Sequence, residues 1–122
     1  MQVTIDVFSG RANPSWGLSP FEIEEFSRRF RAAPRIGGAR QVEGALGYRG
    51  LIVSGEPGRE VDGCVTIVVF AGVASCERDG EVERRLDRGR ELERWLLHTG
   101  AAHLDPDLYD QIARLVQPCP PR

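Results

Sequence analysis

VTIDVFSGRANPSW, residues 3–16, is the stretch around which the rest of this sequence is organised. Its apolar residues at positions 3, 5 and 7 alternate with polar ones, which is the period of a strand buried on one face. Gly10 then permits backbone angles that are closed to other residues, and Pro14 keeps the residue before it extended. The stretch therefore predicts a first strand that ends in a loop.

The next stretch along the chain predicts a helix. Ser19 is a typical N-cap, Pro20 suits the first turn, and Glu22 completes a capping box. Pro34 ends the helical pattern. The apolar side chains between these signals repeat at helical spacing and form the expected buried face: Phe21, Ile23, Phe26 and Phe30.

The middle of the chain predicts strands and the segments that connect them. The expected order is a surface loop over 35–45, a strand over 46–53, a turn region over 54–63 and a strand over 64–70. The last of these is almost continuously apolar, which is typical of a central strand buried on both faces. Strand structure is expected to continue after Gly72. Asp79-Gly80 is a hairpin signal, after which a short further strand around Val82 is an open alternative.

Two helices close the chain. Asp87 can cap the first, which is expected to stop at Gly100 as at a C-terminal glycine cap. Asp105 can cap the second, which ends before Pro118. Its expected buried residues are Leu108, Ile112, Leu115 and Val116.

These patterns predict the α+β class, with a single-layer sheet of three to four mostly antiparallel strands packed against about three helices. At 122 residues and 13.5 kDa, with 41% hydrophobic residues, the chain has the size and composition of one domain. We expect a single domain over residues 1–122, with residues 118–122 as a frayed tail.

Charge and composition narrow the function classes. The net charge of -2 argues against nucleic acid as a partner, because binding to phosphate backbones needs a basic surface. All sixteen basic residues are Arg, which is more typical of a GC-rich bacterial genome than of a chemical requirement. The run Val65 to Ala74 is too short to span a membrane, and no signal segment opens the chain. We expect a cytoplasmic bacterial protein without a membrane partner.

The three cysteines show neither CxxC spacing nor a secreted disulfide pattern. Reduced thiols in a cytosolic compartment are therefore expected. Cys64 and Cys76 lie in or beside strands and are expected to act as buried hydrophobes, whereas Cys119 in the Pro-rich tail is the exposed and oxidisable one.

The strongest candidate site is a binding site at the end of the first strand. Arg11 on its loop, beside free backbone N–H groups, could hold a carboxylate or phosphate. An amide and an aromatic wall would orient such a ligand. The candidate residues for ligand or partner binding are Asp6, Arg11, Asn13, Trp16, Tyr48, Arg49 and Arg90. The same group could equally form a polar brace between loop and helix, with Trp16 closing the edge of the core.

Catalytic and metal signatures are incomplete. His98 and His103, with Asp105 or Asp107, could supply three metal ligands, but their spacing matches no strong metal motif. No GxSxG elbow, GxGxxG or GxxxxGK[ST] loop occurs. We therefore expect no metal and no cofactor, and the sequence leaves open whether the chain is an enzyme.

The element Ser9-Gly10-Arg11-Ala12-Asn13-Pro14-Ser15-Trp16 resembles the strand-terminal Ser-Gly-Arg-x-Asn-Pro-x-Trp element of a group of small bacterial and fungal proteins. The resemblance continues through residues 46–50 and 90–97, so it covers most of the chain. It implies one intact domain and directs attention to the opening loop. It brings no established activity with it.

The leading hypothesis is a small cytosolic, non-enzymatic binding or interaction protein with a protein partner, of which an immunity-type factor is one form. The alternative is a small enzyme or ligand-binding domain that holds an anionic small molecule on the Arg11 loop. A metal-handling domain that uses His98, His103 and a cysteine is a third hypothesis.

Overall fold

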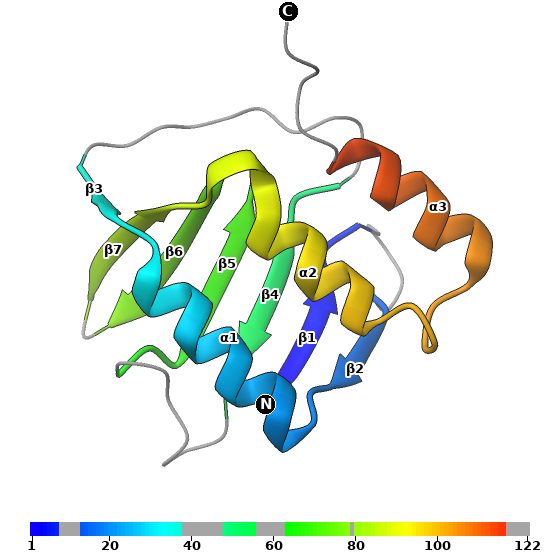
Figure 1. Ribbon diagram of the computed structural model, residues 1–122, viewed down its shortest axis with the longest axis horizontal. Coiled ribbons are helices and arrows are strands. Elements are labelled where there is room, and N and C mark those ends of the chain that lie inside the picture. Colours follow the sequence, from blue (N-terminus) through cyan, green and yellow to red (C-terminus); the bar gives the residue numbers. More distant parts are fainter. Residues whose placement is uncertain (8–12, 38–47, 56–62, 79, 117–122) are drawn as a thin grey trace, which may run out of the picture.

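One open, antiparallel sheet of seven strands forms the framework of the computed structural model, which describes residues 1–7, 13–37, 48–55, 63–78 and 80–116 (Figure 1). The strands, in their order across the sheet, are β2 (Ser15–Gly17), β1 (Gln2–Ile5), β4 (Leu51–Ser54), β5 (Thr66–Phe70), β6 (Val73–Arg78), β7 (Glu81–Leu86) and β3 (Arg35–Ile36). The helices are α1 (Pro20–Ala32), α2 (Glu91–Thr99), α3 (Pro106–Leu115) and a single 3-10 turn, η1 (Arg88–Arg90).

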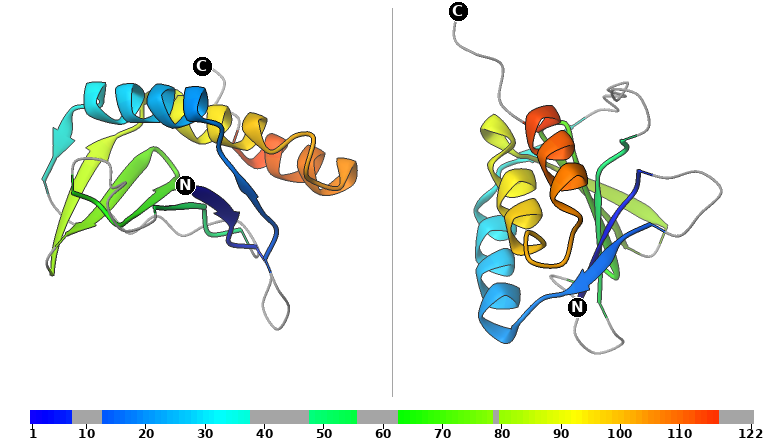
Figure 2. Two further views of the ribbon diagram at one scale, coloured as in Figure 1. Left: turned by 90° about the horizontal axis from the view of Figure 1, so that it is seen from below. Right: turned by 90° about the vertical axis from the view of Figure 1, so that its right-hand side faces the viewer.

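The helices all lie on the same face of the sheet (Figure 2). The hydrophobic core lies between the two layers, because alternate residues of the strands point toward the helices. Two cross-strand rows on that face are buried in all four central strands: Val3, Val53, Ile67 and Cys76, and Ile5, Leu51, Val69 and Ala74. The α+β class is thus confirmed.

The expected sheet of three to four strands is wrong, because the sheet has seven. Two of the unexpected strands, β2 and β3, contain three and two residues, which is too short to show a period of two. The strand over 64–70 is central as expected, but it is not buried on both faces. Thr66, Val68 and Phe70 are only half-buried, so β5 alternates.

The strand β7 was only an option from its sequence, yet it is six residues long and pairs with β6 along its whole length. Its core-facing positions are the charged residues Glu83 and Arg85. The sequence of β7 therefore lacks the alternation of apolar and polar residues that marks a half-buried strand. The Nη1 atom of Arg85 donates to the carbonyl oxygens of Arg31 and Ala33, at 3.2 and 2.9 Å. Its guanidinium also lies 4.8 Å from the ring centre of Phe30, so Arg85 ties the end of α1 to the sheet.

The first helix begins as its sequence predicts. Glu22 N donates to Ser19 Oγ at 3.2 Å, and Ser19 N donates to Glu22 Oε1 at 2.8 Å, which confirms the capping box. Phe26 and Phe30 are fully buried. Phe21 is 77% exposed, so its expected place in the core is wrong. It sits in the first turn, beyond the edge of the face that the sheet covers.

The last two helices lie near their predicted positions. Asp105 caps α3 by accepting from Asp107 N at 2.8 Å, as predicted. Leu115 is 36% exposed, so its expected burial is wrong. Gly100 does end α2, but its φ of -93° is not the left-handed conformation of a glycine cap. No helix in the described ranges is long and apolar enough to cross a membrane.

Candidate functional site

A buried carboxylate, that of Glu93 on α2, is the centre of the main polar cluster. The Tyr48 hydroxyl donates to its Oε2 at 2.5 Å, and the guanidinium of Arg90 donates to both oxygens at 2.8 and 2.9 Å. Ala71 N donates to Oε1 at 3.1 Å. Glu93 is 0% exposed and receives four hydrogen bonds, so its acceptor positions are taken up within the fold.

The backbone around this cluster is held in an unusual conformation. Ala71 and Arg90 have φ values of 53° and 56°, and they are the two non-glycine residues with positive φ among those described. Both donate hydrogen bonds to Glu93. Left-handed backbone at a non-glycine residue costs on the order of 1–2 kcal/mol, so the bonds to Glu93 offset local strain.

The electrostatics of the cluster follow from its burial. Burial, followed by the charge and the hydrogen bond of Glu93, raises the pKa of Tyr48 well above its ordinary value, so the phenol stays protonated. The hydrogen bond to Glu93 raises the pKa of Arg90. The Asp87 carboxylate accepts from Leu92 N and Glu93 N, at 2.8 and 3.1 Å, and burial raises its pKa. It therefore caps α2 across η1, close to where the sequence placed the cap.

Trp16 lies at the other end of α2. Its indole Nε1 donates to Thr99 Oγ1 at 2.9 Å, and a Cβ on Gly100 would lie 2.5 Å from the Trp16 ring. The nine residues of α2 separate this contact from Arg90 by about 13 Å. The candidate set is therefore divided, with Tyr48 and Arg90 at the start of α2 and Trp16 at its end.

The remaining candidate residues belong to the edge of the sheet. Asn13 Oδ1 accepts from Val7 N at 3.1 Å, which helps to join the ends of the loop between β1 and β2. The main chain of Asp6 bonds to Gly50 O and Arg49 N, at 3.0 and 2.8 Å, and extends the pairing of β1 with β4. The Arg49 side chain is exposed. Arg11 lies outside the described residues, so the anion-binding loop is untested.

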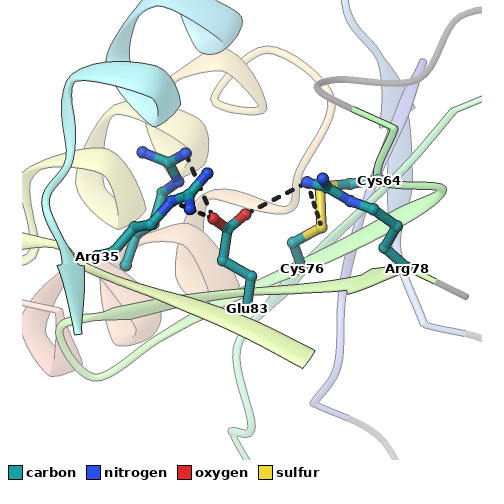
Figure 3. Close-up of a disulfide and its surroundings, with 6 residues drawn as sticks. Arg35, Cys64, Cys76, Arg78 and Glu83 are labelled. Carbon is teal, nitrogen blue, oxygen red and sulfur yellow. Dashed lines mark hydrogen bonds and ion pairs between the residues drawn. A yellow bond between two sulfur atoms is a disulfide. The ribbon is translucent and has the colours of Figure 1, made fainter. Parts of the chain in front are cut away.

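The expectation of reduced thiols at Cys64 and Cys76 is wrong, because the two form a disulfide with their Cα atoms 5.5 Å apart (Figure 3). Cys64 precedes β5. Cys76 lies in β6, and its cross-strand partner in β5 is Ile67. Both cysteines are buried, as expected. Gly63, directly before Cys64, has a φ of 80°, and no spacing rule predicts the pairing of the two cysteines.

Charged side chains surround the disulfide (Figure 3). Arg78 Nη2 lies 3.7 Å from Cys64 Sγ, 3.9 Å from Cys76 Sγ and 3.3 Å from Glu83 Oε2. The Glu83 carboxylate also contacts Arg35 at 2.5 Å and Arg85 at 3.6 Å. Three guanidinium groups thus share one carboxylate, which leaves the cluster positively charged.

Ligands for a metal come together in this cluster and not at the histidines. In the described ranges, the group of three that lies close enough is Cys64, Cys76 and Glu83, whose ligand atoms are within 4.8 Å of one another. The sulfur atoms are bonded to each other here, so they are not thiolate ligands. His98 and His103 are both exposed and form no such group with Asp105 or Asp107.

A cleft of about 340 Å³ lies between the end of α1 and the start of α2. Arg28, Arg29 and Arg88 line it, together with Asp87 and Glu91. Arg28 and Arg29 both bind Glu25, at 2.5 and 2.8 Å, and Arg28 and Arg29 lower the pKa of that carboxyl to about 2. Apolar residues, among them Leu86 and Leu92, also line the cleft, so several guanidinium groups lie near apolar side chains.

The face of the sheet away from the helices is not covered by any helix of the described residues (Figure 2). We call it the open face and define it by one cross-strand row: Thr4, Ile52, Val68 and Ser75. All four residues are half-buried. Ile52 and Val68 are direct cross-strand neighbours at its centre, with a hydroxyl side chain on each side.

Sequence reasoning missed Glu93, although a signal was present. Glu93 lies three and four residues before Leu96 and Leu97, so it occupies the apolar face of its helix. An acid in that position must be paired when the helix packs. Comparison with known proteins adds no assignment, because no protein-family model, curated protein or solved structure matches the chain.

Proposed function

We propose that this chain is a small non-enzymatic binding protein that recognises a partner protein through the open face of its sheet. An immunity-type factor, which binds and neutralises its partner, is one form of such a protein. The open face carries the proposal, because an apolar centre with a polar rim is the usual composition of a protein interface. The cytoplasm is the proposed compartment.

The geometry of the open face supports a protein partner better than a small ligand. Ile52 and Val68 are neighbouring apolar side chains on one face of a sheet, whereas small molecules are usually held in clefts or cavities. Glu77 is exposed and Arg84 half-buried on the same side of β6 and β7, so charges of both signs lie at one margin. Such charges favour one docking orientation over others.

The polar clusters support the same proposal indirectly. The Glu93 carboxylate, the Tyr48 hydroxyl and the fork of Arg90 are bonded to one another. Arg90 Nη1 also donates to Leu115 O at 2.9 Å, which ties α3 to α2. These groups act as a brace of the fold, in which all three guanidinium nitrogens of Arg90 already donate a hydrogen bond within the chain.

The experiment is native mass spectrometry of the untagged protein isolated gently from its own host. We expect a stoichiometric second polypeptide with the unaltered chain. The Val68→Lys variant should lose it while retaining the circular dichroism spectrum of the unaltered chain. Arg114→Gln, an exposed change on α3, is the matched control and should keep the partner. Retention of the partner by folded Val68→Lys would exclude the open face, and bare monomer throughout would exclude a tight partner.

A second candidate function is supported by the cleft between α1 and α2. Arg88 lines it and is exposed, and no hydrogen bond or ion pair of its side chain occurs within the described part of the chain. An anionic small molecule would find a guanidinium there that is not already paired. The cleft is a second location for the anionic-ligand alternative, beside the Arg11 loop, which lies outside the described residues.

The two functions differ in what the protein carries. An added small mass in the native spectrum, lost in Arg88→Gln and kept in Arg114→Gln, would favour the ligand function. A bound mass that persists in Arg88→Gln would place the ligand elsewhere. Since Arg88 and Val68 lie on opposite faces of the sheet, each variant tests one function without disturbing the other.

A further inference from the structure

The disulfide lies next to a cation that would favour its reduction. Arg78 Nη2 is within 4 Å of both sulfur atoms, at 3.7 Å from Cys64 and 3.9 Å from Cys76. Cleavage of a disulfide places a negative charge on the departing sulfur, and a neighbouring cation stabilises that thiolate. A purely structural disulfide needs no such partner.

The surrounding charges favour the thiolate as a group. Among the described residues, Glu83 is the carboxylate in contact with Arg78, and it would repel a thiolate if it acted alone. Arg35 and Arg85 also bind Glu83, at 2.5 and 3.6 Å. Its charge is therefore compensated from the side away from the sulfur atoms, and the guanidinium of Arg78 remains available to them.

The two sulfur atoms differ in their access to solvent. Cys76 is 0% exposed, within β6. Cys64 is 3% exposed, but it lies ahead of β5 between exposed Gly63 and Val65, the latter 56% exposed. Small opening movements at the end of a strand cost less than those inside a sheet. An attacking thiol would therefore reach Cys64 first.

We propose that Cys64 and Cys76 form a redox site that exchanges electrons with a dithiol reductant, with Arg78 as the residue that stabilises the leaving thiolate. A thiolate of the reductant attacks Cys64 Sγ, the bond between the two cysteines breaks, and its electron pair leaves on Cys76 Sγ. The second reductant thiol then displaces Cys64. The reductant becomes a disulfide, the two cysteines become thiols, and two electrons have been transferred.

The redox site is connected to the open face through the backbone. Cys76 lies between Ser75 and Glu77, whose side chains point to the open face, and Thr66 follows two residues after Cys64. Disulfides in the cytosol are typically redox-sensing, and the cytoplasm is the compartment proposed above. Reduction would thus change the backbone at the margin of the open face. The redox site itself does not depend on the proposed partner.

The test uses the Cys119→Ser chain, so that two cysteines remain. The folded, oxidised protein is treated with dithiothreitol, quenched at intervals with a maleimide that adds mass, and separated by gel electrophoresis. We expect both cysteines to be labelled without denaturant. Loss of a guanidinium about 4 Å from the thiolate should slow reduction in Arg78→Gln roughly three- to tenfold. Arg114→Gln is the matched control and should keep the original rate.

Two results would overturn the proposal. Labelling only after the protein is unfolded in urea would make the disulfide structural. Equal rates for Arg78→Gln and Arg114→Gln would remove the role of Arg78. If Arg78→Gln does not fold, Arg78→Lys replaces it and should keep a rate close to the original, whereas high salt, which screens charges, should slow the reduction of the unaltered chain. An unchanged rate in high salt would likewise exclude the charge effect.

Discussion

Removal of the Tyr48 hydroxyl tests the brace around Glu93 most directly. In Tyr48→Phe, the ring keeps its place against Phe70, whose ring centre lies 5.6 Å away, and one donor to the buried carboxylate is lost. A hydrogen bond to a charged group contributes about 1.5–3 kcal/mol. We expect the free energy of unfolding to fall by about 2 kcal/mol, out of the roughly 5–15 kcal/mol that is usual for a domain.

The larger effect should come from Arg90→Met. That change removes the two hydrogen bonds to Glu93 and the one to Leu115 O, and it leaves the Glu93 charge buried with Tyr48 and Ala71 N as its remaining donors. Breaking a buried ion pair in this way costs about 3–5 kcal/mol. Because both changes act on one carboxylate, the double variant should not show the sum of the two losses.

The assay is urea unfolding at pH 7, followed by tryptophan fluorescence with the slope m compared among variants. Tyr109→Phe is the matched control, since the described contacts include no hydrogen bond to its hydroxyl, and it should change stability by less than about 0.5 kcal/mol. If Tyr48→Phe were as mild as Tyr109→Phe, Glu93 would not depend on the phenol. Additive losses in the double variant would also refute a shared network.

Three further outcomes follow from packing and ionisation. Gly100→Ala should lose about 1–3 kcal/mol in the same assay, because its Cβ would lie 2.5 Å from the buried Trp16 ring; unchanged stability would mean that the ring can move. The pKa of Tyr48 is raised in the folded state, so the free energy of unfolding should fall by about 1.4 kcal/mol per pH unit above pH 10, where the unfolded phenol ionises. Tyr48→Phe should remove this contribution, which corresponds to one proton, from the slope. Phe26→Ala should cost about 3–5 kcal/mol and Phe21→Ala less than about 0.5 kcal/mol, since the first is fully buried and the second 77% exposed; equal losses by thermal unfolding would contradict that placement.

Local signals were sufficient for the helices and for the class of fold. The capping box at Ser19 and Glu22 and the acid cap at Asp105 are hydrogen bonds between residues two or three apart, so the order of residues specifies them. The strand at the start of the chain was equally readable, since Val3 and Ile5 alternate with polar residues and are fully buried.

The candidate site was predicted only in part. Tyr48 and Arg90 do come together, but through Glu93, which the sequence analysis did not include. Trp16 is buried at the far end of α2, where Thr99 and Gly100 receive it. Which of several polar residues meet depends on the path of α2 across the sheet, and no spacing in the sequence encodes that path.

The sequence by itself determined where helices begin and end, the first strand, and the α+β class, because these depend on contacts between near neighbours. Only the tertiary structure decided the seven-stranded sheet, the Cys64–Cys76 bond and the burial of Glu93. The edge strands are too short for a periodic pattern, and the core face of β7 carries Glu83 and Arg85 in place of apolar residues. These features form only when segments distant in the sequence pair, because long-range contacts provide the energy that stabilises them.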